Sequence, residues 1–289
     1  MTIEGEIGAL VPDVGGGHGH SQPKLGLWRG TLKTEALHGS GTFMTTKGDL
    51  STDAKIIQEL RKFDTATICN VVATYPGSDV CLNLYDAWHG EYYTDSTLRC
   101  IYPDYGPVCG YAATAWYSDA KPEHTKLDDW ALFDHIDRIK KPVILVAKQT
   151  CSPGLENRIG LFGGNMTTEF KAMGVQGVVT DGPMRDYMEI KPMKVQYLAA
   201  GMTSGHGPLQ LRGAGAPVTV AGMTVMPGEI VHMDHCGACK FPAENLGDVL
   251  KLATELIRRE KDYQSKFREP GFSLKRWKTE AAKEKKQIV

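Results

Sequence analysis

The stretch Gly174-Val-Gln-Gly-Val-Val-Thr-Asp-Gly-Pro-Met-Arg-Asp186 decides the fold. Its apolar run, Val175 to Val179, ends at Asp181-Gly-Pro183, a pattern typical of a buried strand that enters a tight turn. Arg185 and Asp186 follow the turn at once, so we expect both side chains on a loop at the mouth of the strand. An Asp carboxylate suits Mg²⁺ or Mn²⁺, and the planar Arg guanidinium matches an organic carboxylate. The pair therefore indicates either a metal site that binds an acid or a weak ion pair in a surface turn.

The segment before this strand predicts a helix, because its apolar residues recur at helical spacing and it stops at a glycine. Gly163 and Gly164 open that helix. A glycine-rich entry exposes the first backbone N–H groups, which together with the helix dipole form an anion site. We predict that Gly164 and the amides of Asn165 and Met166 face the same pocket as Arg185 and bind a carboxylate. The alternative is an ordinary helix whose glycines only permit close packing.

A helix with a glycine-rich start, followed by Gly-x-x-Gly-Val-Val-x-Asp-Gly-x-x-Arg-Asp, resembles the RraA-like family. This family includes the class II 4-hydroxy-4-methyl-2-oxoglutarate / 4-carboxy-4-hydroxy-2-oxoadipate aldolases. The likeness runs from about residue 57 to about residue 260 and is carried by residues 60–70, 106–114, 128–137, 142–147, 227–237 and 241–242. The resemblance implies an α/β fold, a swivelling β/β/α domain with an N-terminal extension and a C-terminal helix. It also implies an active site built where the subunits of a trimer meet.

The same resemblance implies a role for each residue of the motif. Asp186 would be the direct protein ligand to Mg²⁺ or Mn²⁺, and Arg185 would bind the substrate carboxylate and stabilise the enolate oxygen. Asn165 and Met166 would give backbone N–H groups to that carboxylate. In the aldolases an acidic residue twenty-one positions before the Arg orients metal-bound water, whereas Gly164 occupies that position here.

This departure bears on the chemistry, because a missing carboxylate near a hard divalent ion weakens the ordering of its waters. Either another acid, from the neighbouring subunit, fills the role, or the chemistry differs from aldol cleavage. Asp181, four residues before Arg185, is a candidate substitute. An Asp before Gly is also typical of a residue that shapes the turn. The sequence assigns no general base.

The predicted reaction follows from the charge that it develops. Cleavage of a carbon–carbon bond in a 2-oxo acid leaves a pyruvate enolate, which a divalent ion stabilises as a Lewis acid. Decarboxylation of oxaloacetate passes through the same enolate. We therefore predict a divalent-metal-dependent lyase acting on a small-molecule carboxylate. The alternative is a non-catalytic binding or regulatory protein, since the family's name-giving members bind and inhibit a ribonuclease.

Composition argues against nucleic acid and membranes as partners, and the sequence falls into three segments. With 42% hydrophobic residues and a formal charge of −1, the chain has no basic field for nucleic acid or an anionic membrane. It lacks both an apolar run of about twenty residues and the basic and apolar regions of a signal peptide, so we expect a cytoplasmic protein. We divide it into an N-terminal extension (1–50), an RraA-like catalytic domain (51–260) and a basic C-terminal tail (261–289). The resemblance implies a homotrimer or homohexamer.

Four further groups of residues have more than one interpretation. Cys236-Gly-Ala-Cys239, flanked by His232, Asp234 and His235, predicts either a Zn²⁺ site or the turn of a hairpin. The aromatic residues of 73–100 are candidates to line a substrate pocket, or else they pack in the core or at an oligomer contact. His206 is a candidate acid or base near neutral pH, or a structural loop residue. In the extension, His18 and His20 are metal ligands or part of a flexible Gly/His loop.

Overall fold

The computed structural model describes residues 52–119 and 125–287. The predicted N-terminal extension, with His18 and His20, lies outside the described residues. The helices are α1 (Thr52–Leu60), α2 (Thr65–Val72), α3 (Trp130–Arg138), α4 (Gly164–Ala172), α5 (Tyr187–Ile190), α6 (Leu246–Arg268) and α7 (Leu274–Gln287). The strands are β1 (Ala73–Thr74), β2 (Tyr85–Asp86), β3 (Arg99–Cys100), β4 (Val108–Ser118), β5 (Val143–Thr150), β6 (Val175–Thr180), β7 (Gln196–Ala199), β8 (Gln210–Ala214), β9 (Val218–Val220), β10 (Met223–Val225), β11 (Ile230–Asp234) and β12 (Gly237–Phe241).

The main sheet is mixed, and its parallel centre positions the candidate site. Strands β4, β5, β6 and β7 are parallel neighbours in that order. Strand β11 joins β4 antiparallel and pairs with β12, while β8 also pairs with β4 and β3 pairs with β7. The parallel strands read as near-continuous apolar runs because both faces of the sheet are covered. The strand predicted from Val175 to Val179 is present as β6.

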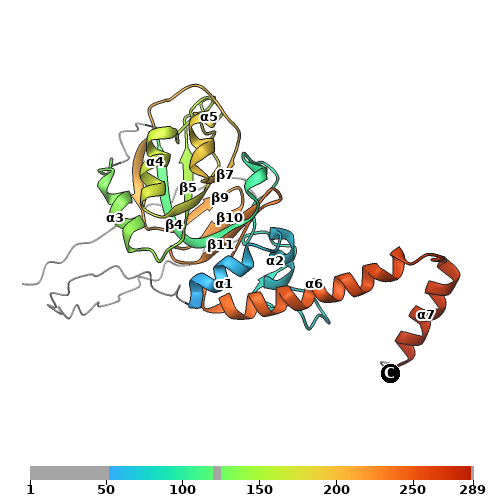
Figure 1. Cartoon of the computed structure of the whole chain (residues 1–289). Coiled ribbons are helices and arrows are strands. Elements are labelled where there is room, and N and C mark those ends of the chain that lie inside the picture. Colours follow the sequence, from blue (N-terminus) through green and yellow to red (C-terminus); the bar gives the residue numbers. More distant parts are fainter. Residues whose placement is uncertain (1–51, 120–124, 288–289) are drawn as a thin grey trace, which may run out of the picture. The chain divides into compact units, whose positions relative to one another are not determined.

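The two faces of the sheet are covered by different elements. On one face, helices α3, α4 and α5 pack on the strands through side chains such as Ile136, Phe170 and Ile190, all of them fully buried (Figure 1). On the other face, Val220 and Met223 of the β9–β10 hairpin lie in one cluster with Val146, Leu198 and other strand residues. The layers are therefore β/β/α, as the resemblance implies, and this confirms the predicted α/β fold class.

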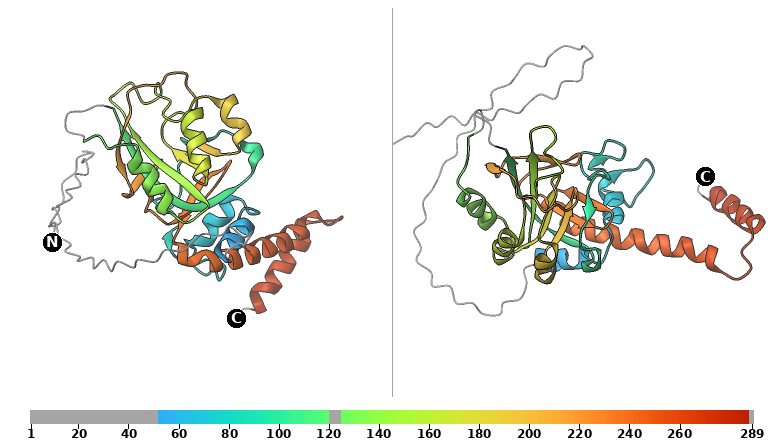
Figure 2. Two further views of the ribbon diagram at one scale, coloured as in Figure 1. Left: turned by 60° about the vertical axis from the view of Figure 1, so that its left-hand side comes forward. Right: turned by 90° about the horizontal axis from the view of Figure 1, so that it is seen from above.

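A third apolar cluster joins α1, α2 and α6 to β11 and β12, and Figure 2 shows α6 running alongside α1 and α2. Asp64 caps α2, since its carboxylate accepts a hydrogen bond from Thr67 N at 2.6 Å. Thr65-Ala-Thr67 is therefore the first turn of this helix.

The C-terminal part is helical beyond the predicted domain end. Leu246, Val249 and Ala253 bury one side of α6, which is therefore an amphipathic helix. The helix continues past residue 261 to Arg268, and α7 follows from Leu274, within the segment predicted as a basic tail. Among the described residues, no helix has the length and apolar character needed to cross a bilayer.

His232 makes the fold sensitive to acid. The ring is fully buried, with Nδ1 2.9 Å from Thr65 Oγ1 and Nε2 3.1 Å from the carbonyl oxygen of Leu60. Burial lowers the pKa of His232 to about 4 from its ordinary 6.5, because the charged ring would lose its hydration. A depressed folded-state pKa gives a stabilisation that is complete above pH 6.5 and lost as pH falls toward 4.

We expect the free energy of unfolding to fall by up to about 3 kcal/mol across this interval because of His232. Urea unfolding at a series of pH values measures the loss. His232→Gln keeps a side chain that can hydrogen-bond but does not titrate, so its stability should vary less with pH over the same interval. Equal slopes for the variant and the natural protein would contradict the assignment.

Candidate functional site

The candidate site forms where β6 ends and α4 begins. The amide of Arg185 donates to the carbonyl oxygen of Phe162 at 3.0 Å, and the amide of Leu161 donates to that of Pro183 at 3.2 Å. These two bonds hold the segment after β6 against the segment that leads into α4. Because β5 and β6 are parallel, both segments lie at the carboxyl edge of the sheet, where open α/β sheets bind ligands.

Asp186 and Arg185 share one environment at this edge. Asp186 adopts a left-handed conformation, with φ 59° and ψ 39°, which Asp tolerates better than most residues. Its Oδ2 accepts a hydrogen bond from the amide of Gly164 at 3.0 Å and lies 3.6 Å from Nε of Arg185. The side chains of Arg185 and Asp186 are 30% and 35% exposed, so a ligand can reach both.

Gly163, the residue before α4, is required by this packing. A Cβ at position 163 would collide with Oδ2 of Asp186 and lie 2.9 Å from Nε of Arg185. The first hydrogen bond of the helix runs from the amide of Thr167 to the carbonyl oxygen of Gly163 at 3.0 Å. The amides of Asn165 and Met166 precede this bond and belong to the group that a helix leaves without intrahelical acceptors.

A further carboxylate, from Glu189, lies at the same place. A Cβ at position 164 would collide with it, so the side chain occupies the space that a non-glycine residue at 164 would need. Glu189 was not among the residues predicted from the sequence. Its spacing of three residues from Asp186 on a helical segment was the available signal, since such residues are neighbours on a helix surface.

Asp181 does not join this group. Its Oδ2 lies 2.5 Å from Nζ of Lys148, and its Oδ1 accepts from the amide of Gln149 at 2.7 Å. Burial raises the pKa of Asp181 above its ordinary value, although Lys148 opposes the rise. No hydrogen bond or ion pair between Asp181 and Arg185 or Asp186 is found in the described part of the chain. Asp181 thus fixes the turn after β6 to the end of β5, which favours the turn-shaping interpretation.

The ring of His206 lies on a loop next to the site. Its Nδ1 is 2.8 Å from the carbonyl oxygen of Gly207, and the side chain is exposed. The preceding residue, Gly205, accepts a hydrogen bond from the amide of Gly160 at 2.8 Å. A Cβ at position 160 would meet the side chain of Arg185 at 3.2 Å. The loop is therefore close to Arg185, while the catalytic role of His206 stays a prediction.

The cysteine segment is a hairpin. Asp234, His235 and Cys236 have ligand atoms within 4.8 Å of one another. However, Asp234 accepts hydrogen bonds from the amides of Thr65 and Cys236 at 2.8 and 2.7 Å, and thereby holds the β11–β12 turn. His232 and Cys239 are fully buried. These contacts favour the hairpin interpretation over a Zn²⁺ site.

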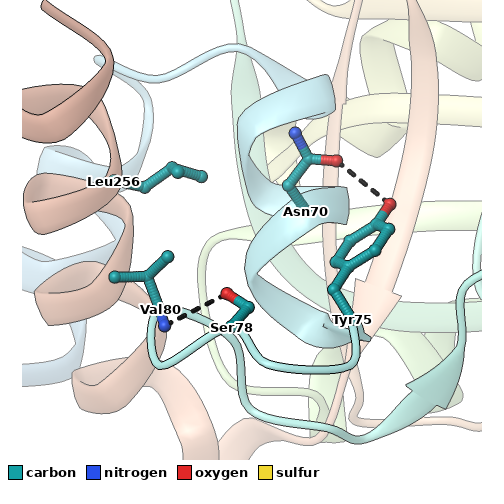
Figure 3. Close-up of a pocket in the computed structure, with 5 residues that line it drawn as sticks. All are labelled: Asn70, Tyr75, Ser78, Val80 and Leu256. Atoms are coloured by element: carbon teal, nitrogen blue, oxygen red, sulfur yellow. Dashed lines mark hydrogen bonds between the residues drawn. The ribbon is translucent and has the colours of Figure 1, made fainter. Parts of the chain in front are cut away.

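The aromatic residues of 73–100 mostly pack in the core. Tyr85 stacks on Tyr92 with ring centroids 4.8 Å apart, and Tyr92 is only 2% exposed. Trp88 is exposed and meets Tyr75 edge-on. A pocket of about 300 Å³ near this segment is lined by Asn70, Tyr75, Ser78, Val80 and Leu256 (Figure 3). It shares no residue with the candidate site, so we assign it no part in the chemistry.

The donor atoms at the site fit a hard divalent cation. A Cβ added to Gly163 would meet a carboxylate oxygen of Asp186, and a Cβ added to Gly164 would meet the carboxylate oxygens of Glu189. Carboxylate oxygens are preferred by Mg²⁺ and Mn²⁺, whereas zinc sites usually combine sulfur and nitrogen ligands. The adjacent guanidinium of Arg185 can pair with a carboxylate of a ligand held by such an ion.

Comparisons with known proteins match this chain to the RraA-like family. A family description named RraA-like (Aldolase/RraA) matches residues 79–239. A putative 4-hydroxy-4-methyl-2-oxoglutarate aldolase from Burkholderia multivorans is 36% identical over 87 residues, 29% of this chain and 52% of that protein. The uncharacterized protein MJ0644 from Methanocaldococcus jannaschii is 27% identical over 141 residues, 48% of this chain and 67% of that protein. The chain thus spans about half and two thirds of the length of these relatives.

Among solved structures, RraAS2 from Streptomyces coelicolor is similar in fold. It is described as an unusual member of the RNase ES inhibitor RraA protein family. It superposes with a TM-score of 0.54 at 20% identity, over 75% of this chain and 99% of that one.

Proposed function

The chain belongs to the RraA-like (Aldolase/RraA) family, and on that basis we propose that it is a divalent-metal-dependent lyase acting on a 2-oxo acid or a related carboxylate. The observation that carries the proposal is the contact of three groups at one sheet edge. Oδ2 of Asp186 lies 3.0 Å from the amide of Gly164 and 3.6 Å from Nε of Arg185. A carboxylate, a helix N-terminus and a guanidinium therefore border the same space.

Each group has a separate task in the proposed reaction. Asp186 would hold Mg²⁺ or Mn²⁺, which supplies Lewis-acid polarisation of the substrate's carboxylate and carbonyl oxygens. Arg185 would bind the substrate carboxylate through its planar fork and stabilise negative charge on the enolate oxygen. The amides of Asn165 and Met166 would donate to that carboxylate and orient it. His206 is proposed as an acid or base beside this group.

One of the two relatives is named as a lyase, and its name leaves the substrate of this chain open. The Burkholderia multivorans protein is named as a putative aldolase, and the aligned part covers 52% of it. Aldol cleavage of a 4-hydroxy-2-oxo acid and decarboxylation of oxaloacetate both release an enolate of pyruvate, so the same site serves either reaction. Both classes of substrate belong in the first assay.

The assay that tests the proposal is pyruvate release from oxaloacetate and from 4-hydroxy-2-oxo acids. We expect release with added Mn²⁺ or Mg²⁺ and its loss after treatment with a chelator, restored by the metal. Samples without protein correct for the spontaneous metal-catalysed decarboxylation of oxaloacetate. Metal-independent release, or no release from any of these acids, would contradict the proposal.

A second candidate function is binding and regulation without catalysis. It is favoured by the similarity to RraAS2, which is described within a family of RNase ES inhibitors. Such a role depends on a surface and not on Arg185 and Asp186. Retention of a partner by variants of both residues, together with absence of pyruvate release, would favour it over the lyase.

We also propose that the site is used in a homotrimer or homohexamer. Met188 on α5 is 76% exposed, and Met202, in the segment that bridges to Met184, is 59% exposed. Two exposed methionines beside a candidate active site are typical of a surface that a partner subunit covers. Light scattering of the full chain measures the number of subunits.

A further inference from the structure

The carboxylate of Glu189 occupies the space that the side chain of an acidic residue at position 164 would need. Gly164 is buried at the start of α4, and any Cβ added to it would meet the carboxylate carbon and both oxygens of Glu189. The glycine and the glutamate are therefore complementary. A larger residue at 164 is compatible with this fold only if Glu189 moves away.

Nothing else in the described part of the chain engages the Glu189 side chain. No hydrogen bond or ion pair to its carboxylate is found among residues 52–119 and 125–287, and the residue is exposed. An exposed carboxylate without a partner is free to accept a cation. Its backbone is fixed, since the amide of Glu189 donates to the carbonyl oxygen of Asp186 at 3.0 Å.

Asp186 and Glu189 approach the same residue from different directions. Asp186 contacts the amide of Gly164, at 3.0 Å, and Glu189 contacts the Cα side of Gly164. Two carboxylates near one point repel each other unless a cation lies between or beside them. Mg²⁺ is commonly held through one or two protein carboxylates, so a second carboxylate beside Asp186 suits such a site.

We propose that Glu189 is the second carboxylate of the divalent-cation site and replaces the acid that position 164 lacks. The inference rests on the proposed function, because that function places the cation at Asp186. It makes Glu189 a positioning residue for the cation. With Glu189 in this role, no acid from a neighbouring subunit is needed to replace the one missing at position 164. Aldol cleavage is then compatible with the residues of this chain.

The first test measures Mn²⁺ binding directly, with no substrate present. We expect Glu189→Gln, which keeps the shape of the side chain and removes its charge, to weaken Mn²⁺ binding by about 10- to 100-fold in calorimetric titration. Glu169→Gln is the matched control, because Glu169 is also exposed and lies on α4, toward the other end of the helix. The control should bind Mn²⁺ like the natural protein.

The second test exchanges the position of the acid. Gly164→Asp alone should weaken Mn²⁺ binding, because the new Cβ collides with Glu189 and the new charge repels it. In the Glu189→Ala background the same change should strengthen binding, since the space is then free for the new carboxylate. This reversal of sign is specific to the complementarity of the two positions, and loss of folding cannot produce it. Circular dichroism melts of all variants identify any that fail to fold.

The outcomes separate this inference from the proposed function. If the natural protein binds no Mn²⁺, both are overturned. If the natural protein and Glu189→Gln bind Mn²⁺ equally well while Asp186→Asn does not, the proposed cation site stands and the role of Glu189 is overturned. Weaker binding by Glu189→Gln, with rescue by Gly164→Asp in the Glu189→Ala background, is the expected result.

Discussion

Replacing Asp186 with Asn is expected to lower metal-dependent pyruvate release by about 1000-fold while leaving the fold intact. Asn tolerates the left-handed conformation that Asp186 adopts, with φ 59°, so the backbone at the start of α5 is retained. The amide oxygen of Asn can still accept the hydrogen bond from the amide of Gly164. The variant loses only the negative charge that would hold the ion.

The expected loss in kcat/KM is about 1000-fold, equivalent to about 4 kcal/mol of transition-state stabilisation. Steady-state kinetics over a series of Mn²⁺ concentrations measure it, and saturating metal should not restore the rate. Asp137→Asn, on the exposed side of α3, is a matched control that should keep full activity. Full activity of Asp186→Asn would rule out Asp186 as the metal ligand.

The central part of the fold was accessible from the sequence because the signals are local. The run Val175 to Val179 and its Gly-Pro ending report a buried strand without any knowledge of the neighbouring strands. The helix from Gly164 to Ala172 ends before Gly174, which has φ 87°, as the sequence indicates for a C-terminal glycine. The same local signals placed Arg185 and Asp186 together.

The parts that could not be predicted depend on contacts between distant segments. Glu189 lies at the candidate site only because α5 approaches Gly164, which is twenty-five positions earlier in the chain. In the sequence Asp181 was a candidate metal-site acid, although an Asp before Gly more often shapes the turn, and its contact with Lys148 on β5 favours the turn. His232 resembled a zinc ligand in the sequence, but its ring nitrogens face Thr65 and Leu60.

Two substitutions of Arg185 are expected to lower activity to different extents, depending on whether the charge or also the planar shape of the guanidinium is removed. Lys keeps the positive charge but lacks the planar fork, so Arg185→Lys should lose about 10- to 100-fold in kcat/KM. Arg185→Ala removes both the charge and the fork and should lose about 100- to 1000-fold in kcat, as when a donor to a developing oxyanion is removed. Mn²⁺ binding in the absence of substrate should change little in either variant, because Asp186 is retained.

Added guanidinium distinguishes a role in substrate binding from a role in folding. The cavity left by Arg185→Ala is bordered by Gly163 and Asp186, so a small planar cation can return to it. Guanidinium at a concentration well below that which unfolds the protein should raise the rate of Arg185→Ala, and ethylammonium should raise it less. Equal rates with and without guanidinium, in a variant as active as the natural protein, would show that the carboxylate of the substrate binds elsewhere. Rescue by the planar ion alone would place the substrate carboxylate beside Asp186, because the fork acts only on an acceptor within hydrogen-bond distance.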